Sequence, residues 1–274
     1  VAPLKSDPLP DAWRDLPAVE FTQPDAPPYS WYQPQLRSVV RLPVANEKPV
    51  RIELLVNLTP SDLGSLAEFR SNMQVIVPSM KVLMGLDPAD GSVGLSIADL
   101  NLQKMVYEQP ELRIANIGRG AMPGRGEWPR LRPVLADFSP AKVDAKTLAG
   151  ERRMLGFFSG EVSRLLAPAD PPRVLIVLSA PVYFTKQETA PPPELPPDPH
   201  RHVFYICYTR PPHFTPGELI WQELPDRIRP GQSYSFADDI ERILRPRGAR
   251  IFRVYRPEDF RKALAAILNE ISAI

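Results

Sequence analysis

The chain is short of the residues that build disulfide frameworks and multi-ligand metal sites. Its 274 residues include a single cysteine, Cys207, which excludes an internal disulfide and any multi-cysteine zinc or iron–sulfur site within one chain. The 3 histidines stand at positions 200, 202 and 213, in one half of the sequence. No run of about 18 apolar residues is present, so the sequence predicts no membrane-spanning helix.

An excess of charge of one sign is also missing. Lys and Arg number 33 and Asp and Glu number 32, which leaves a formal charge of +1 and no global attraction to nucleic acid or an anionic membrane. Residues 242–262 are a local exception, because eight positive charges stand there against two negative ones. This stretch lacks the aromatic stacking platform typical of single-strand binders. It predicts a basic face in contact with solvent. The alternative is that this face docks an acidic protein or nucleic acid, of which nucleic acid is disfavoured.

Glycine is scarce, at 14 residues, whereas proline is abundant, at 35. Many of the prolines lie in residues 1–34 and 191–199, where their spacing forbids regular helix and strand. The first of these segments also carries several aromatic side chains, which disordered segments usually lack. We therefore predict that residues 1–49 form a proline-rich arm packed on a body of residues 50–274, with a stiff proline-rich loop at 186–200.

Apolar periodicity alternates between strand and helix along the body. Strand patterns occupy residues 51–56, 92–98, 102–108, 173–178, 202–208 and 249–255, and helical spacing occupies 63–84, 143–166, 235–244 and 257–271. The almost continuously apolar run at 173–178 predicts a central parallel strand. Pro78 predicts a kink in the first helix, and Gly150, Gly156 and Gly160 predict close packing of the second helix on the sheet. The alternation predicts an α/β fold with a doubly wound, mainly parallel central sheet and helices on both faces.

The segment after the first predicted strand carries Asn57, Thr59 and Ser61 at alternate positions. In element order and in this motif the chain resembles the von Willebrand factor A (VWA) domain, whose metal-ion-dependent adhesion site has the form Asp-x-Ser-x-Ser after its first strand. Residues 93–98 resemble the family's second strand, 174–179 its fourth strand and 255–271 its closing helix. The resemblance covers about residues 50–272 and implies a three-layer sandwich that binds another protein or a matrix.

The matched site departs from the family's pattern at the two positions where the family has aspartates. Asparagine replaces the first aspartate of the motif, and Ser179-Ala180-Pro181 follows the fourth strand where the family has a second aspartate. Mg²⁺ usually requires one or two carboxylates. The resemblance therefore implies a degenerate site with no cofactor or weakly bound Mg²⁺, formed by Asn57, Thr59, Ser61, Thr147 and Ser179. Alternatively, Thr59-Pro60-Ser61-Asp62 is a capping box that begins a helix and holds no ligand.

A second candidate site is the loop at residues 118–126, where Arg119 and Arg125 stand among glycines that can cradle an anion. It lacks the Lys-Ser/Thr ending of a phosphate loop, which favours a surface turn. Ser96 lies within a strand pattern and not at the strand-to-helix turn that a hydrolase serine requires. Likewise, His202 and Cys207 are predicted to face opposite sides of one strand.

Together these observations predict a non-catalytic protein-binding module of adhesion or scaffold type. Its partner is expected to be another protein. The alternative is an enzyme of a doubly wound fold that binds a phosphate-bearing or anionic substrate through loop 118–126. The concentration of proline in two segments is typical of an exposed or exported interaction domain. Export to the periplasm or the extracellular space is therefore favoured, with the cytoplasm as the alternative.

Overall fold

A computed structural model describes residues 42–59, 66–112, 148–167, 171–183, 201–208 and 238–274. Most of the predicted arm and of the loop at 186–200 lies outside these ranges. The division of the chain into an arm of residues 1–49 and a body of residues 50–274 thus stays a prediction.

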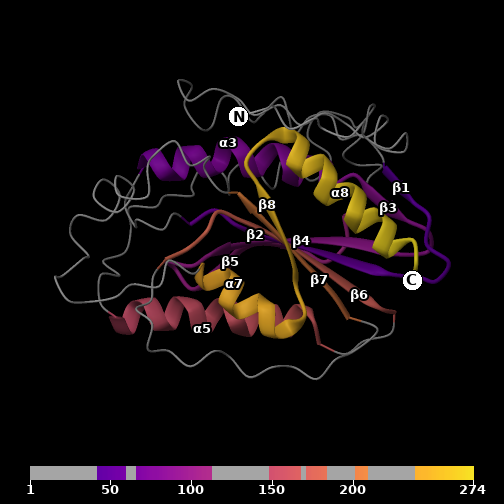
Figure 1. Ribbon diagram of the computed structural model, residues 1–274. Coiled ribbons are helices and arrows are strands. Elements are labelled where there is room, and N and C mark those ends of the chain that lie inside the picture. Colours follow the sequence, from indigo (N-terminus) through magenta and orange to yellow (C-terminus); the bar gives the residue numbers. More distant parts are fainter. Residues whose placement is uncertain (1–41, 60–65, 113–147, 168–170, 184–200, 209–237) are drawn as a thin grey trace, which may run out of the picture.

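A six-stranded sheet forms the centre of the protein (Figure 1). Its strands are β2 (Arg51–Asn57), β4 (Ser92–Asp99), β5 (Lys104–Gln109), β6 (Arg173–Ser179), β7 (Arg201–Tyr208) and β8 (Arg250–Val254). They lie in the order β5-β4-β2-β6-β7-β8, and every neighbouring pair is parallel except β4 with β5. Counted along the chain, this order is 3-2-1-4-5-6, the doubly wound arrangement in which the progression of strands reverses between β2 and β6.

A second, smaller sheet stands beside the main one. It consists of β1 (Leu42–Val44) and β3 (Leu86–Pro88), which pair in parallel. Asn46 links the segments that follow these two strands. Its Oδ1 accepts a hydrogen bond from the amide of Ala89 at 2.8 Å, and its Nδ2 donates to the Ala89 carbonyl at 2.9 Å. One half-buried side chain thus extends the pairing beyond the strands.

Helices cover both faces of the sheet. Figure 1 shows α3 (Leu66–Leu83) and α8 (Pro257–Ile271) above it, and α5 (Leu148–Leu165) and the short α7 (Asp239–Leu244) below it. A 3-10 turn, η3 (Arg245–Arg247), follows α7. None of the helices described is long and apolar enough to cross a membrane. The predicted α/β fold, a doubly wound sheet in a three-layer sandwich, is confirmed.

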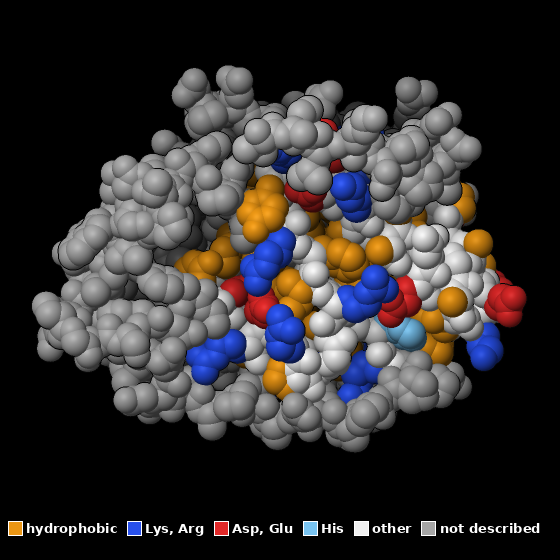
Figure 2. Space-filling model, in the orientation of Figure 1, with side chains coloured by type: hydrophobic (Ala, Val, Ile, Leu, Met, Phe, Trp, Pro, Cys, Tyr) orange, Lys and Arg blue, Asp and Glu red, His pale blue; other side chains and the backbone are white. Residues whose placement is uncertain are grey.

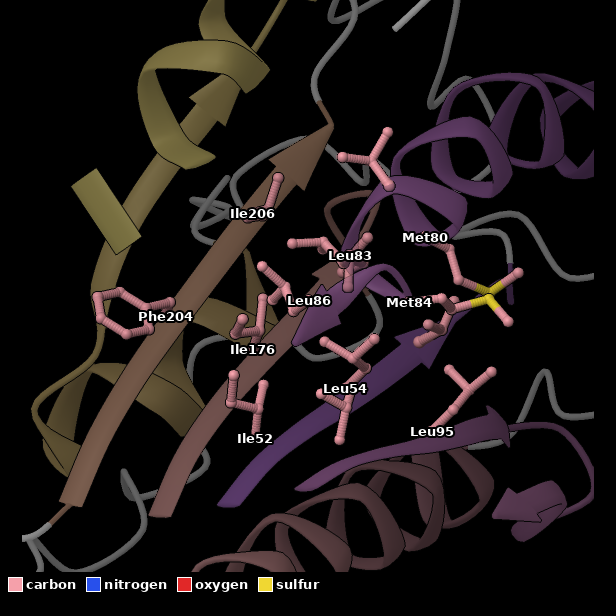
Figure 3. Close-up of a cluster of buried hydrophobic side chains, with 14 of the residues drawn as sticks. Ile52, Leu54, Met80, Leu83, Met84, Leu86, Leu95, Ile176, Phe204 and Ile206 are labelled. Atoms are coloured by element: carbon pink, nitrogen blue, oxygen red, sulfur yellow. The ribbon is translucent and has the colours of Figure 1, made fainter. Parts of the chain in front are cut away.

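The core consists of two apolar layers, one on each face of the sheet. Ile52, Leu54 and Val56 of β2 face α3 and α8, whereas Leu55 faces α5 and α7. Figure 3 shows the first layer, in which side chains of β2, β4, β6 and β7 meet Met80 and Leu83 of α3, Met84 just after it and Leu86 of β3. Because β2 lies between β4 and β6 and has helices on both faces, its residues from Ile52 to Asn57 are all buried.

The closing helix α8 agrees with its sequence signals. Pro257 stands at its first turn, where the missing N–H removes no hydrogen bond. The Asp259 carboxylate accepts hydrogen bonds from the amides of Tyr255 at 3.1 Å and Arg256 at 3.0 Å. The other helices also form at the predicted places, although α7 is shorter than predicted. Pro78 lies inside α3, which continues to Leu83.

The predicted role of the glycines of α5 is wrong for the two whose surroundings are described. Gly156 and Gly160 are exposed, and a Cβ added at either position would meet no atom within 4 Å. The buried stripe of α5 runs through Met154, Phe158 and Val162. Residues two positions further along a helix lie on the opposite side, so these glycines face away from the sheet.

Gly91 is a glycine at which close approach to the backbone of a neighbouring segment is required. A Cβ there would lie 2.2 Å from the carbonyl oxygen of Val50, which accepts the Ser92 amide at 3.1 Å where β2 and β4 begin to pair. We expect Gly91→Ala to lower the free energy of unfolding by about 1–3 kcal/mol, because backbone must move. Urea denaturation of Gly91→Ala beside Gly156→Ala tests this. The control should gain about 0.5–1 kcal/mol, and an unchanged Gly91→Ala would contradict the close approach.

Candidate functional site

The point where the strand order reverses is occupied by a pair of neutral polar side chains. Asn57 ends β2 and Ser179 ends β6, and the two residues are direct partners in the register. Both are completely buried. The Asn57 Nδ2 donates a hydrogen bond of 2.9 Å to the Ser179 Oγ. In doubly wound sheets the ligand crevice lies at this position, outside the carboxyl ends of the strands.

Thr59 completes this arrangement, and we call Asn57, Thr59 and Ser179 the carboxyl-edge clasp. The Asn57 Oδ1 accepts the Thr59 amide at 3.0 Å, and the Thr59 Oγ1 accepts the Leu100 amide at 3.1 Å. The Ser179 hydroxyl donates to the Ala180 carbonyl at 2.6 Å. The clasp therefore joins the segments that follow β2, β4 and β6.

Three of the five predicted metal-site residues are thus brought together. Ser61 and Thr147 lie outside the described residues, as does most of the predicted capping box. The clasp offers a cation only neutral oxygens, and those of Asn57 and Thr59 already accept backbone amides. Among the described residues, no group of three or more His, Cys, Asp or Glu side chains is placed to hold a metal ion. These residues do not fit the carboxylate-rich shell that Mg²⁺ prefers.

Sequence reasoning missed a second polar cluster, centred on Asp238. This buried carboxylate begins α7: its Oδ1 accepts the amides of Ile240 at 3.0 Å and Val182 at 2.9 Å. Its Oδ2 accepts the Tyr205 hydroxyl at 2.6 Å and faces the Cys207 Sγ at 3.7 Å. An aspartate before a short apolar helical run is an N-cap signal, but the pairing with Tyr205 depends on tertiary structure.

Burial controls the protonation of this cluster. It raises the pKa of Asp238 to about 6, although the hydrogen bonds from the Tyr205 hydroxyl and from the amides of Val182 and Ile240 lower it. Burial, together with the Asp238 charge, also raises the pKa of Cys207 to about 12 and that of Tyr205 well above its usual value. Cys207 is therefore a protonated core thiol. The prediction that His202 faces the other side is confirmed, since its ring contacts Glu270 of α8 at 3.1 Å.

A small cleft of about 190 Å³ lies at the other edge of the sheet, beside the start of β2 and β6. Burial raises the pKa of Glu53 there, while the nearby arginines lower it. The Glu53 Oε1 lies 2.5 Å from the Arg51 Nε and 3.8 Å from the Arg173 Nη1. Arg164 binds Glu108 at 2.6 Å and thereby fixes α5 to β5. The arginines of this cleft thus have carboxylate partners.

The other candidate, the glycine and arginine loop at 118–126 with Arg119 and Arg125, lies outside the described residues. Ser96 is buried within β4, which confirms that it does not stand on a strand-to-helix turn. It lines the cleft just described, whose lining residues include no histidine, cysteine or lysine. The described part of the chain therefore places no base of the usual serine-hydrolase kind beside Ser96.

Large apolar side chains are exposed at the carboxyl edge of the sheet. Within the described residues they are Leu102, Tyr183 and Tyr255, with exposed fractions of 42%, 37% and 40%. Leu102 follows β4, Tyr183 follows β6 and Tyr255 follows β8. Since these three strands are parallel members of one sheet, their carboxyl ends share an edge. The clasp and the exposed apolar side chains therefore belong to the same end of the molecule.

No family model matches the chain, and no curated protein matches it. Among solved structures, the conserved hypothetical protein BatB from Bacteroides thetaiotaomicron is similar at 11% identity and a TM-score of 0.42, over 82% of this chain and 100% of that one. A D319A mutant of the PilB minor pilin from Streptococcus sanguinis is similar at 9% identity and a TM-score of 0.37, over 84% of this chain and 62% of that one.

Replacing Asn57 with alanine should destabilise the fold. The change leaves the buried Thr59 amide without its acceptor, which we expect to cost about 1–3 kcal/mol of unfolding free energy. Chemical denaturation measures this, with Asn46→Ala as the matched control. Asn46 makes equivalent amide contacts at a half-buried position, where water can replace them, so its loss should be smaller. Equal losses for the two variants would show that the clasp is not sealed from water.

Asp238 should make stability depend on pH. Its pKa is about 6 in the folded protein against 3.8 for the free group, so the folded state holds the proton more tightly than the unfolded state. The associated stabilisation is complete below pH 3.8 and is lost as the pH rises through about 6, by on the order of 3 kcal/mol. Unfolding free energies of the wild type and Asp238→Asn across this window test it. A constant difference between the two proteins would contradict the raised pKa.

Proposed function

We propose that this chain is a non-catalytic protein-binding module, of adhesion or scaffold type, with a VWA-like fold and a weakened or absent divalent-cation site. The doubly wound order and the place of the clasp support this proposal. The strands that resemble the family's second and fourth, β4 and β6, flank β2. Asn57, Thr59 and Ser179 meet where the family's motif would lie, but with neutral side chains that bind one another.

The observation that carries the proposal is the exposure of Leu102, Tyr183 and Tyr255 around the carboxyl edge. Single exposed apolar residues are common on protein surfaces. Here, however, the large ones in the described part of the chain all follow carboxyl ends of one sheet. Tyrosine is enriched at protein interfaces, where its ring is buried and its hydroxyl finds a polar partner. Such a surface fits another protein better than a small charged ligand.

The polar groups at this end of the molecule also favour binding over catalysis. Asn57 and Ser179 are sealed beneath the surface, and the Asp238 carboxylate accepts hydrogen bonds from two backbone amides and Tyr205. A catalytic acid or base must reach its substrate within hydrogen-bond distance. These buried groups instead hold the loops in place. Export to the periplasm or extracellular space, which the proline-rich segments suggest, is part of the same proposal.

Photo-crosslinking tests where the partner binds. A crosslinking amino acid in place of Leu102 should give a discrete adduct with another protein in the native organism, because this side chain is exposed on the proposed face. The matched control places the same group at Lys48, an exposed residue just before β2 at the amino edge of the sheet. Adducts of the same size and yield from both positions, or none from Leu102, would contradict a binding face at the carboxyl edge.

Calorimetric titration tests the cation site. We expect no binding heat from Mg²⁺ at concentrations up to about 1 mM, because the clasp provides no carboxylate. Asn57→Ala is the control that assigns any heat to this site. The weakened site would be contradicted if the wild type bound Mg²⁺ at about 1 mM or below and Asn57→Ala did not. A cation would then belong to the proposed function.

A further inference from the structure

The sheet ends on one side in β8, whose outer edge forms a row of backbone groups. Within the described residues, β8 pairs only with β7, so alternate N–H and C=O groups on its other side have no strand partner. β8 lies in front of the other strands in Figure 1, and the same face of the molecule is seen in Figure 2. An edge of this kind is a template for another extended segment.

Arginines flank this edge on both faces of the sheet. Arg253 forms an ion pair with Glu241 of α7, whereas Arg250 forms one with Glu270 of α8. Because α7 and α8 cover opposite faces, one guanidinium lies on each side of the strand. Arg250 also lies over the ring of Phe252, 5.5 Å from its centroid. Figure 2 shows Lys and Arg side chains spread over this face, with apolar and backbone atoms between them.

The carboxylates near β8 neutralise the arginines there only in part, because Glu241 and Glu270 pair with three arginines, Arg245, Arg250 and Arg253. Glu241 is shared by Arg245 and Arg253, and Glu270 by Arg250 and His202. The side chains of Glu241 and Glu270 are 13% and 28% exposed, whereas those of Arg253 and Arg250 are 42% and 53% exposed. An approaching segment therefore meets guanidinium groups first, and carboxylates lie beneath them.

We infer that the β8 edge docks an acidic extended segment of the partner protein, which adds a strand beside β8. The inference rests on the protein-binding function proposed above and names the chemistry of the partner. Successive side chains of an added strand point to opposite faces of the sheet. Acidic residues on either face thus find Arg250 or Arg253, while a basic segment is repelled. Backbone hydrogen bonds supply affinity, and the arginines select the segment by its charge.

The test uses the full chain and a short capped peptide in which pairs of glutamates alternate with single valines. Binding is followed by fluorescence anisotropy, and the site by hydrogen–deuterium exchange. Two control peptides separate the contributions. One has lysine in place of every glutamate, and the other keeps the glutamates but has proline in place of each valine, which prevents strand pairing. We expect the acidic peptide to bind, to slow amide exchange in β8 and to bind more weakly at higher salt.

Variants locate the charges. Arg250→Glu with Arg253→Glu should weaken acidic-peptide binding by about tenfold or more. Arg250→Gln with Arg253→Gln gives a milder loss and covers the case in which charge reversal prevents folding. The matched control, Lys48→Gln with Lys104→Gln, removes the same charge away from β8, because Lys48 precedes β2, three strands along the sheet, and Lys104 begins β5 at the opposite edge. It should leave binding unchanged.

Several outcomes would overturn the inference. They are an acidic peptide that fails to bind, binding without protection of β8, equal binding of the proline peptide, and an unchanged affinity in the Gln variants. Equal binding of a single-stranded oligonucleotide would assign the face to nucleic acid instead. None of these results affects crosslinking through Leu102, so failure at β8 is distinct from failure of the protein-binding function.

Discussion

The structure depends on one constraint, which is that β2 is buried on both faces and that any polar side chain on it needs a partner inside the protein. Two positions test this constraint, Glu53 near the start of the strand and Asn57 at its end. Glu53 is held by Arg51. Gly94 lies opposite Glu53 in the register. Glycine is required there because an added Cβ would lie 2.2 Å from the Glu53 Oε2. Asn57 is held by Ser179. The two buried polar residues of β2 thereby restrict which residues its neighbouring strands can carry.

The same constraint shapes the end of the sheet at which a doubly wound fold binds ligands. The Asn57 amide uses its donor on Ser179 and its acceptor on Thr59, and Thr59 in turn holds the turn after β4. The polar atoms of the clasp are therefore directed inward and fix the connections. What faces solvent includes apolar side chains such as Leu102 and Tyr183. Affinity at such a surface comes from apolar burial more than from charge.

The sequence predicted the six strands of the main sheet and their mainly parallel arrangement, because hydrophobic period determines these features. It did not predict β1 and β3. That Asn57 and Ser179 lie together was implied by the resemblance to the VWA domain. The sequence also did not predict the Asp238 cluster, because the contact with Tyr205 joins residues brought together only by the loop geometry after β6 and the start of α7. The glycines of α5 were misassigned for a related reason. A glycine in a helical pattern reveals close packing only when the buried stripe passes through it, and the stripe of α5 passes through Phe158 instead.

The apolar carboxyl edge and the β8 edge, the two proposed binding surfaces, meet at one residue. Tyr255 follows β8 directly, so it stands at the carboxyl edge and also at the end of the strand that Arg250 and Arg253 flank. A partner that covers the apolar carboxyl edge can therefore continue along β8 without crossing an unrelated part of the surface. Charge at the strand edge then governs the approach and the choice of partner, because electrostatic complementarity acts on association rate and specificity more than on affinity. Apolar contact at the carboxyl edge governs how long the partner stays, because affinity differences between related complexes lie mostly in the dissociation rate.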